Sequence, residues 1–416
     1  MGGVTPDSTL ETVFRMESAR IVATAARIVR DVGIAEEIAQ DALVAALEQW
    51  PLTGVPERPG AWLTATAKHR AVDLVRRRET YARKLAEVGR TLTEEAYDPE
   101  PPGPGDIDDD VLRLIFTACH PVLSAEARAA LTLRLVGGLR TDEIARAFLV
   151  PEATLAARIT RAKRTLAKAG VAFEVPYGED RAARLGSVLE VIYLIFNEGY
   201  AATAGDDLLR PGLCEDALRL ARTLAALAPR EGEAQGLAAL LELQSSRTAA
   251  RTGPEGQPVL LAAQDRRRWN RLLVLRGFAA LERAGDGRTY GPYALQAAIA
   301  ACHARAPSYD ETDWATIAAL YGRLGVLAPS PVVELNRAVA VSMAEGPEAA
   351  LPLVDALAAA PGLAGYHLLP SVRGDLLARL GREAEARAEF ERATALTRNE
   401  GERALLRAKA RALGGA

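Results

Sequence analysis

Apolar residues recur every three or four positions along most of the chain, which is the period of an α-helix. The stretch Ala35–Trp50 shows this pattern clearly, because its apolar and polar residues fall on opposite sides of a helix. The apolar side carries Ile38, Ala42, Ala45 and Ala46. The polar side carries Glu36, Glu37, Gln40 and Asp41. On periodicity alone, this stretch is a surface helix with a solvated acidic face.

A second predicted helix is strongly basic. The segment Lys68–Lys84 contains seven Lys or Arg residues and two acids. Basic side chains at this density can neutralise nucleic-acid phosphates, although an Arg-rich helix can also cover its own core with long side chains. Trp62 is expected to precede this helix, where its ring could stack on an unpaired base. Asp73 is spaced to pair with Arg70 or Arg77 across helical turns.

A third region, Ser124–Gly170, is predicted to form helix, turn, helix, turn and helix. Thr141 is a suitable N-cap, and Leu149–Pro151 would form the tight turn before a last helix at Glu152–Lys168. The predicted core consists of Ile144, Ala145, Leu149, Leu155 and Ile159. The last helix ends in basic residues without an acid, namely Arg158, Arg161, Lys163, Arg164 and Lys168. The spacing predicts a helix-turn-helix that enters the major groove, with a plain helical hairpin as the alternative.

Between these two basic regions lies Tyr97–Asp110, which is rich in Pro, Gly and acidic residues. Such a segment cannot bury apolar surface, so it is predicted to be a linker. From Glu94 to Asp110 there are eight acids and no base. We therefore expect a first block at residues 1–90, an acidic linker at 91–107, a second block at 108–172 and a third at 173–416.

The third block is predicted to consist of paired helices with an internal repeat. In Pro370–Arg398, small residues and one aromatic stand where a tetratricopeptide repeat (TPR) of about 34 residues would place them. These residues are Gly374, Ala386, Phe390 and Ala393. Weaker copies carry Ala338, Ala350 and Val354, and then Ala217, Ala221 and Pro229. The chain is thus predicted to be all-α, with two small helical domains followed by a TPR-like α-solenoid.

Composition narrows the functional classes. Only 5% of the 416 residues are aromatic while 49% are hydrophobic, which suits packed helices. The net charge is −3, so a DNA-binding surface requires basic residues to be concentrated locally. The three cysteines are far apart without a CxxC pair, so no disulfide framework and no metal site is expected. The pairs Cys119–His120 and Cys302–His303 point about 100° apart on a helix, which does not form a shared site. No phosphate loop or nucleophile elbow is present, so no catalytic residue and no enzyme activity are expected.

The start of the chain and the segment Val191–Thr203 bear on location and on possible catalysis. Met1–Leu10 lacks a charged region followed by an apolar stretch, so no signal peptide is expected and the location is predicted to be cytoplasmic. Asn197, Glu198 and Tyr200 are polar groups at a predicted helix end. We interpret them as a helix-terminating turn with Gly199 as the C-cap, and not as a catalytic site.

The order AEEIAQDALVAALEQW, a turn with proline, and AWLTATAKHRAVDLVRRR resembles the second conserved region of extracytoplasmic-function (ECF) sigma factors of RNA polymerase. The resemblance implies that the acidic helix docks on the polymerase β′ clamp through Glu37, Gln40 and Asp41. It implies that the basic helix captures and melts the promoter −10 element through Trp62, Lys68, His69, Arg70, Arg76 and Arg77. His69 stands where the family often has Asn, so the −10 sequence preference does not carry over, and Asp73 would be structural.

The segment VPEATLAARITRAKRTL resembles the fourth conserved region, which binds the −35 element. The resemblance implies DNA-binding roles for Thr154, Arg158, Arg161, Arg164 and Lys168. Arg158 and Arg161 are expected near bases or adjoining phosphates, whereas Arg164 and Lys168 would touch phosphates only. Ala157 replaces the usual Ser, so the −35 base preference does not carry over. The acidic linker would thread the RNA exit channel of the polymerase, with an inert spacer as the alternative.

The segments VIYLIFNEGYAAT and QDRRRWNRLL, with the terminal repeats, resemble the ECF subgroup that has a TPR-like extension. The resemblance implies a sigma factor without cofactors, whose partners are core RNA polymerase (β′ clamp and β flap) and promoter DNA, but no membrane. The preferred hypothesis for the extension is intramolecular contact with the sigma domains that controls their access to polymerase. Two alternatives stay open: a helix-turn-helix regulator with a TPR sensor domain, and a TPR interaction scaffold whose basic helices are merely surface.

Overall fold

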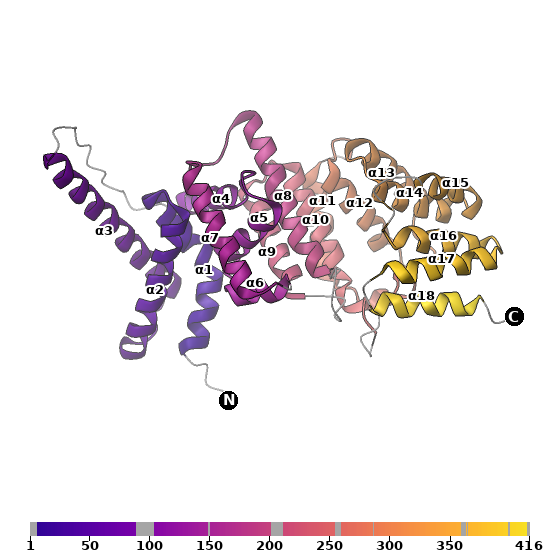
Figure 1. Ribbon diagram of the computed structural model, residues 1–416, viewed down its shortest axis with the longest axis horizontal. Helices are drawn as coiled ribbons and strands as arrows, with labels where there is room; N and C mark the ends of the chain where they lie inside the picture. The colour runs from indigo at the N-terminus through magenta and orange to yellow at the C-terminus, as the bar shows by residue number, and fades with distance from the viewer. Residues whose placement is uncertain are drawn as a thin grey trace. The chain divides into compact units, whose positions relative to one another are not determined.

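The computed structural model describes residues 6–88, 104–148, 150–200, 211–253, 259–285, 287–358, 363, 365–397 and 400–413. Within these ranges the regular structure consists of eighteen α-helices and three short 3₁₀ helices, without a β-strand (Figure 1). The predicted all-α class is confirmed. The chain divides into two compact units, Met1–Ile195 and Phe196–Ala416, which we describe separately.

The first unit is built on the long helix α1, which packs against α2, α3 and α4. A second cluster within the same unit joins α5, α6 and α7. The helices of this unit are α1 (Pro6–Val29), α2 (Val32–Thr53), α3 (Pro59–Val88), α4 (Pro104–Ala118), α5 (Ala125–Leu135), α6 (Thr141–Ala147), α7 (Glu152–Lys168) and most of α8 (Gly178–Tyr200).

Local residues explain where two of these helices begin. Asp31 precedes α2, and its carboxylate accepts hydrogen bonds from the backbone N–H groups of Gly33 (2.7 Å) and Ile34 (3.0 Å). Ser124 caps α5 by accepting a hydrogen bond from the N–H of Ala127. Both caps satisfy amide groups that have no partner inside the helix.

Helix α4 begins at Pro104, inside the segment predicted to be linker. Proline at the first position and acidic residues in the next turns are favourable at a helix N-terminus, which explains why this acidic stretch is helical. Near the middle of α4, the buried Asp110 pairs with Arg27 of α1 (2.9 Å) and with Arg113 (2.6 Å). The predicted linker at 91–107 was therefore too long at its C-terminal side, and its earlier residues lie outside the described ranges.

The first part of α8 belongs to the first unit, although the sequence placed the boundary after residue 172. The Ser187 hydroxyl donates a hydrogen bond to the Cys119 carbonyl (2.6 Å), and Arg128 of α5 pairs with Glu190 (3.1 Å). Val188 on the same helix is fully buried. The compact unit continues to Ile195, and these contacts join the first part of α8 to α5 and to the end of α4.

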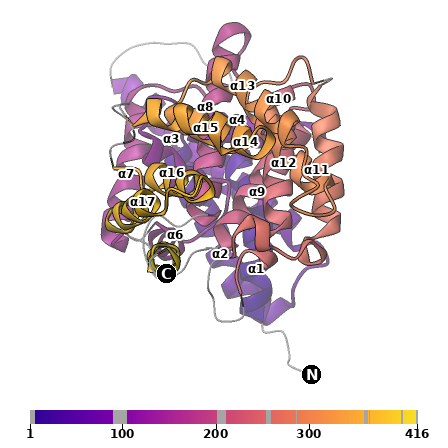
Figure 2. The same ribbon diagram turned by 90° about the vertical axis from the view of Figure 1, so that its right-hand side faces the viewer.

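The second unit is a series of helices in which α10 packs on α9, α11 and α12, and each helix from α12 to α18 packs on the next (Figure 2). Short 3₁₀ helices at Thr248–Ala250, Leu261–Ala263 and Arg266–Arg268 connect α10 and α11. The α-helices are α9 (Pro211–Leu227), α10 (Gly232–Ser246), α11 (Arg271–Ala284), α12 (Pro292–Arg305), α13 (Trp314–Leu327), α14 (Pro331–Ala344), α15 (Pro347–Leu357), α16 (Leu368–Arg379), α17 (Glu383–Leu396) and α18 (Glu400–Ala412).

The residues that suggested a repeat lie in the core of the second unit. A Cβ added to Gly374 of α16 would lie 2.8 Å from Cε1 of Phe390 and 3.2 Å from the Ala386 carbonyl oxygen on α17. Glycine therefore permits the close approach of the two helices, as predicted. Six of the other marker residues are also buried, whereas the marker Pro229 is exposed; the buried six are Ala217, Ala221, Ala338, Ala350, Val354 and Ala393. Their burial confirms the predicted helix packing, while the tetratricopeptide assignment stays a prediction.

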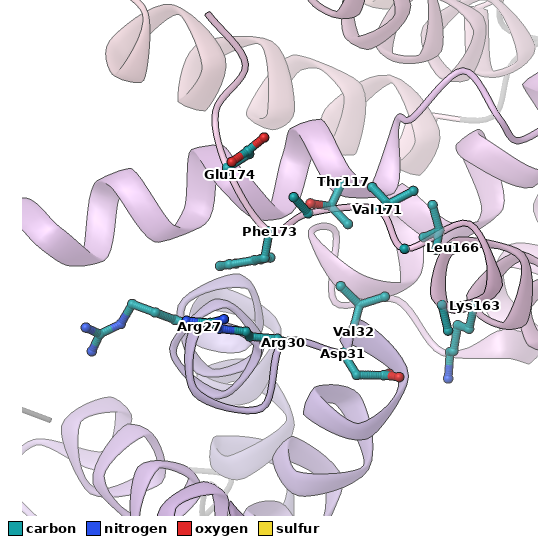
Figure 3. A pocket seen from close by; sticks show the side chains of 13 residues that line it. Arg27, Arg30, Asp31, Val32, Thr117, Lys163, Leu166, Val171, Phe173 and Glu174 are labelled. Carbon is teal, nitrogen blue, oxygen red and sulfur yellow. The ribbon is translucent and has the colours of Figure 1, made fainter. Parts of the chain in front are cut away.

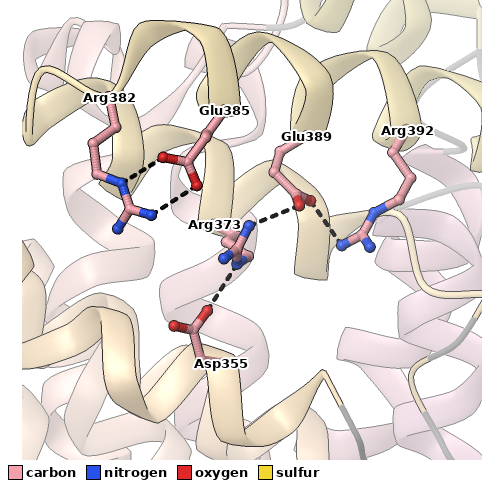
Figure 4. Close-up of polar contacts among 6 residues, drawn as sticks. All are labelled: Asp355, Arg373, Arg382, Glu385, Glu389 and Arg392. Carbon is pink, nitrogen blue, oxygen red and sulfur yellow. Dashed lines mark hydrogen bonds and ion pairs between the residues drawn. The ribbon is translucent and has the colours of Figure 1, made fainter.

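An ionic network ties three of these helices together (Figure 4). Arg373 of α16 pairs with Asp355 of α15 (2.7 Å) and with Glu389 of α17 (2.9 Å). Glu389 also pairs with Arg392 (2.7 Å). The pKa of Arg373 is raised, first by its hydrogen bond to Asp355, so the network holds its charge in place.

Gly199 does not act as the predicted C-cap, because α8 continues to Tyr200. A Cβ at Gly199 would lie 2.8 Å from the backbone nitrogen of Cys214 on α9. The glycine therefore serves close helix packing and not helix termination. Beside it, burial raises the pKa of the Cys214 thiol to about 12, which keeps this cysteine protonated.

Among the described residues, no helix is both long enough and apolar enough to cross a lipid bilayer.

Candidate nucleic-acid interface

Helix α7 occupies the residues predicted for it, Glu152–Lys168, and has two distinct faces. Its buried face follows a helical spacing and consists of Leu155, Ile159, Ala162 and Leu166. These side chains pack on α5 and α6, whose Ile144 and Ala145 are also buried. Four of the five predicted core residues are thus confirmed, and Leu149 lies outside the described residues. The other face of α7 is left to solvent.

The solvent face of α7 carries the residues predicted to bind the −35 element. Thr154, Arg161, Arg164 and Lys168 are exposed, and Arg158 is half-buried. Arg158 lies near Glu126, whose pKa is lowered chiefly by its own backbone N–H and the Ser124 hydroxyl and further by this arginine. Arg158 is therefore the least free of the five. The exposed set forms a continuous basic surface that could approach DNA phosphates.

The short helix α6 completes the helix-turn-helix. It begins at Thr141, and its first backbone hydrogen bond runs from Ile144 N–H to the Arg140 carbonyl. The carboxylate of Glu143 accepts a hydrogen bond from the Arg140 N–H (2.8 Å). Arg140 is therefore the N-cap in place of the predicted Thr141, and Glu143 makes the reciprocal bond typical of a capping box.

Lys163 does not share the exposed face of α7. Its ammonium pairs with Glu36 of α2, and Arg134 of α5 pairs with the same carboxylate (2.5 Å). Glu36 is only 7% exposed, so the expectation that it lies on a solvated acidic face was wrong. Two cations compensate the buried carboxylate, because a lone buried charge would be costly.

A cavity of about 670 Å³ lies beside this ionic contact (Figure 3). Its walls come from the end of α1, the start of α2, α4 and the end of α7, and Figure 3 shows Lys163 next to Asp31 and Val32. A Cβ on Gly33 would lie 3.5 Å from Cδ of Lys163, so the lysine stem packs on the start of α2. None of the residues predicted to bind DNA or polymerase lines this cavity, which separates it from the basic faces.

Helix α3 begins at Pro59, earlier than expected, so Trp62 lies in its first turn and not ahead of it. The Trp62 ring meets the ring of Trp50 on α2 edge to face, with 5.6 Å between centroids. Trp62 is half-buried by this contact. Its ring is therefore held in place by α2, with only part of its surface open to solvent.

Two neighbouring stripes of polar residues run along the outer side of α3. Trp62, His69 and Arg76 are spaced by seven residues and form one stripe, and Arg70 and Arg77 form the next. His69, Arg70, Arg76 and Arg77 are exposed, whereas Lys68 is half-buried and lies to one side. The structure thus brings five of the six predicted −10 residues to one side of a single helix.

Asp41 and Asp73 show how charge is arranged around α3. Arg70 pairs with Asp41 of α2 at 3.3 Å. Asp73 is exposed, and the ion pairs of the described residues do not include the predicted partnership with Arg70 or Arg77. Tertiary packing therefore supplied Arg70 with a partner from another helix instead of its own.

The outer face of α2 presents the residues predicted to bind polymerase. Glu37 and Asp41 are exposed, and Gln40 is half-buried. Val44 and Leu47 continue the same face and are 50% and 45% exposed, so they add apolar surface to it. The two residues were not predicted as part of this face. Val44 follows Gln40 by four positions and Leu47 follows Val44 by three, so the helical spacing places them on it.

In the described part of the chain, no three His, Cys, Asp or Glu side chains gather closely enough to hold an ion. Cys119 lies 3.2 Å from the Thr132 hydroxyl, and burial raises the pKa of its thiol to about 11. A protonated, buried thiol is a poor metal ligand and a poor nucleophile.

Comparison with known proteins bears directly on these two helical clusters. Residues 13–80 match the family described as sigma-70 region 2, and residues 113–166 match sigma-70 region 4. The ECF RNA polymerase sigma factor SigL of Mycobacterium tuberculosis is 30% identical over 143 residues, which are 34% of this chain and 77% of SigL. The chain belongs to the ECF sigma factors of the sigma-70 family. This family acts in transcription initiation through promoter recognition and is not a family of catalysts.

Two further matches extend beyond the sigma regions. An uncharacterized protein of Rhizobium meliloti, R00370, is 47% identical over 386 residues, which are 92% of this chain and 90% of R00370. Residues 184–285 match a family of unknown function, DUF6596. The region 2 match covers α2 and most of α1 and α3, and the region 4 match covers α5 to α7. The basic faces of α3 and α7 thus lie in the two sigma regions, as predicted.

Proposed function

We propose that this sigma factor binds core RNA polymerase and directs promoter-specific initiation, with α7 at the −35 element and α3 at the −10 element. The observation that carries the proposal is the pair of basic faces. Each helix buries one side in its own helical cluster and exposes cationic side chains on the other, and of these Arg70 pairs with Asp41. Rigid helices with free cations can place side chains against DNA without first breaking internal contacts.

At the −35 element, the N-terminal half of α7 would enter the major groove. Thr154, Arg158 and Arg161 are the candidates for base edges, because they stand in that half and precede the phosphate-directed residues. Arg164 and Lys168 would contact the backbone, which positions the helix without selecting a sequence. The half-buried state of Arg158 supports Arg161 as the stronger DNA contact of the two.

At the −10 element, α3 would hold the separated strand. Arg76 and Arg77 would neutralise phosphates, and His69 on the same side would face a base. Trp62, held by Trp50, would offer the open part of its ring for stacking. Lys68 lies off this side and would touch only the border of the bound strand.

Polymerase docking is proposed for the outer face of α2. Glu37, Gln40 and Asp41 supply polar contacts to the β′ clamp, and Val44 and Leu47 supply apolar area that a partner would remove from water. Region 4 would contact the β flap. The acidic linker would occupy a basic channel of the polymerase.

The second unit is proposed to be a TPR-like regulatory domain that controls polymerase engagement through contact with the sigma regions. Support comes from its size, its covalent attachment and the helix packing at Gly374 and Phe390. A helix-turn-helix regulator without polymerase is less well supported, because it leaves the sigma region 2 match at residues 13–80 without a purpose.

The test is run-off transcription with purified core RNA polymerase on the gene's own upstream region. The full-length protein is compared with a version ending at Ile195, because an end near residue 172 would strip α8 from α4 and α5. Specific transcripts from the full-length protein are expected, and a truncation that is inactive or hyperactive would make the second unit a regulator. Equal activity of the two would reject regulation while leaving the sigma function intact.

The control for this test uses matched arginines. Arg161→Gln together with Arg164→Gln should abolish specific transcripts, whereas Arg267→Gln, an exposed arginine of the second unit, should not. If neither the full-length protein nor the truncation supports initiation, yet both bind promoter DNA alone, the regulator without polymerase takes the lead.

A further inference from the structure

The second unit contains a cavity of about 550 Å³ that the proposed sigma function does not use. It lies between the end of α10, the 3₁₀ segments that follow, and helices α12, α13, α14, α16 and α18. Trp314, Tyr309 and Tyr321 give it aromatic surface. Cavities of this size, with aromatic walls and a few convergent polar groups, are typical of small-molecule sites.

Three buried polar atoms at this cavity have no hydrogen-bond partner in the described part of the chain. They are Nε1 of Trp314, Nδ1 of His303 and Oε1 of Gln264. The rings of Trp314 and His303 meet edge to face at 5.1 Å, so both are fixed. Buried polar groups are nearly always satisfied, so these three atoms leave unused hydrogen-bonding capacity beside the cavity.

The acidic residues of the cavity are already compensated. Asp375 pairs with Lys409 at 2.7 Å, and Glu402 pairs with His367 at 3.0 Å. The His367 hydrogen bond is also the main reason that the pKa of Glu402 is lowered. These carboxylates therefore hold their own cations and leave little negative charge to attract a cationic ligand.

The arginines of the cavity lack such compensation. Arg247 donates a hydrogen bond to the Tyr200 hydroxyl (2.7 Å), and the Arg251 guanidinium lies 3.6 Å from the centre of the same ring. Neither has a carboxylate partner among the described residues. Burial, followed by Arg247 and Arg266, lowers the pKa of His303 to about 4, which is the response expected of a histidine in a positive potential.

We propose that this cavity binds a small organic anion with an aromatic or apolar body. The acidic group would lie against Arg247 and Arg251, which provide charge-assisted hydrogen bonds. The body would lie along Trp314 and Tyr309, within reach of the unpartnered indole N–H. The proposal concerns the second unit alone and is independent of the proposed polymerase and promoter binding.

The test uses two fluorescent probes of similar shape and different charge on the full-length protein. Anilinonaphthalene sulfonate is an aromatic anion, and phenylnaphthylamine is its neutral analogue. Titration of each probe, followed by fluorescence and by isothermal calorimetry, should give one saturable site for the anion. Absence of a saturable anion site would overturn the proposal.

Two variants change the charge of the cavity in different ways. Arg247→Gln removes a cation, and Asn336→Asp adds an anion at an exposed, cavity-lining position where folding is not at risk. Each should weaken binding of the anionic probe about tenfold or more and leave the neutral probe within about twofold. The matched control Arg267→Gln, an exposed arginine outside the cavity, should change neither.

The outcomes are decisive even if Arg247→Gln fails to fold, because Asn336→Asp keeps every arginine. Loss of anion binding in Asn336→Asp with an intact far-ultraviolet spectrum supports the site. Equal weakening of both probes would show that the cavity selects by shape and not by charge, and unchanged anion binding in Asn336→Asp would place the probe elsewhere. Either result overturns the proposal.

Discussion

The exposed arginines of α3 and α7 in the first unit contrast with a set of ion-paired arginines in the second unit. On α3 and α7 of the first unit, Arg76, Arg77, Arg161 and Arg164 are exposed. In the second unit, arginines form ion pairs between helices. Arg222 of α9 pairs with Glu242 of α10 (2.7 Å), and Arg373 of α16 pairs with Asp355 and Glu389. The exposed cations are accessible to a binding partner, whereas the paired cations connect neighbouring helices. A net charge of −3 conceals this division, because it averages over both.

The largest effect is expected from His303 in the second unit, whose pKa is lowered first by burial and then by Arg247 and Arg266. Its pKa in the folded protein, about 4, lies below the ordinary value of 6.5. As the pH falls through 6.5, His303 becomes protonated in the unfolded chain, but in the folded protein it stays neutral until about pH 4. This histidine should therefore cost roughly 2–3 kcal/mol of stability over that range.

Urea unfolding at several pH values measures this effect. The difference between the wild type and His303→Gln should be flat above pH 7 and grow in favour of the variant as the pH falls toward 4. A difference that does not depend on pH would mean that burial and the neighbouring arginines do not lower the pKa of His303 in the folded protein.

The next largest effect tests the division of arginines directly. Arg373→Ala removes two partners at once and leaves Glu389 with Arg392 alone, so it should lower the free energy of unfolding by about 2 kcal/mol. Arg164→Ala on the solvent face of α7 should change it by less than about 0.5 kcal/mol. Urea unfolding followed by circular dichroism compares the two, and equal losses would break the distinction between the units.

Within the first unit, Glu36 and Asp110 are buried carboxylates that each pair with two cations, and Glu36 joins α2 to α5 and α7. Glu36→Gln keeps the shape but removes the charge that compensates Arg134 and Lys163, and it should cost about 1–2 kcal/mol. Its exposed neighbour provides the control, since Glu37→Gln should cost less than about 0.5 kcal/mol. If the two variants unfold alike, Glu36 is solvated in solution and the contact between α2 and α7 is weak.

The smallest effect on folding, with a clear effect on binding, concerns the free cations. Arg161→Gln combined with Arg164→Gln should lower the salt dependence of DNA binding by about one to two in the slope of log affinity against log salt, because Arg164 loses a phosphate contact and Arg161 lies near bases or the adjoining phosphates. Fluorescence anisotropy with duplex DNA at several salt concentrations measures it. An unchanged slope would show that these arginines do not reach phosphates.

The sequence predicted the local elements of the first unit well. Helix α7 has the predicted bounds, and Ile144, Leu155 and Ile159 are buried because helical periodicity specifies which face meets a neighbour. Acidic residues followed by an apolar run were harder to interpret. Pro104 starts a helix where composition predicted a linker, because the favourable residues of a helix N-terminus are also those of a solvated loop.

Several features of the candidate sites depend on residues far apart in the chain. The ring of Trp62 contacts Trp50, and Arg70 pairs with Asp41. The buried Glu36 pairs with Arg134 and Lys163. None of these partners stands at a spacing within one helix. Periodicity identifies an exposed or buried position, but it does not identify which distant charge will meet it.

The sequence by itself determined the all-α class, the two basic helices and the residues on their solvent faces, because these follow from composition and from the period of a helix. Only the tertiary structure decided that the first unit extends to Ile195, that Lys163 turns to Glu36, and that Arg247, Arg251 and His303 surround one cavity. These three features depend on how helices pack, because a packing surface combines residues that lie far apart in the sequence.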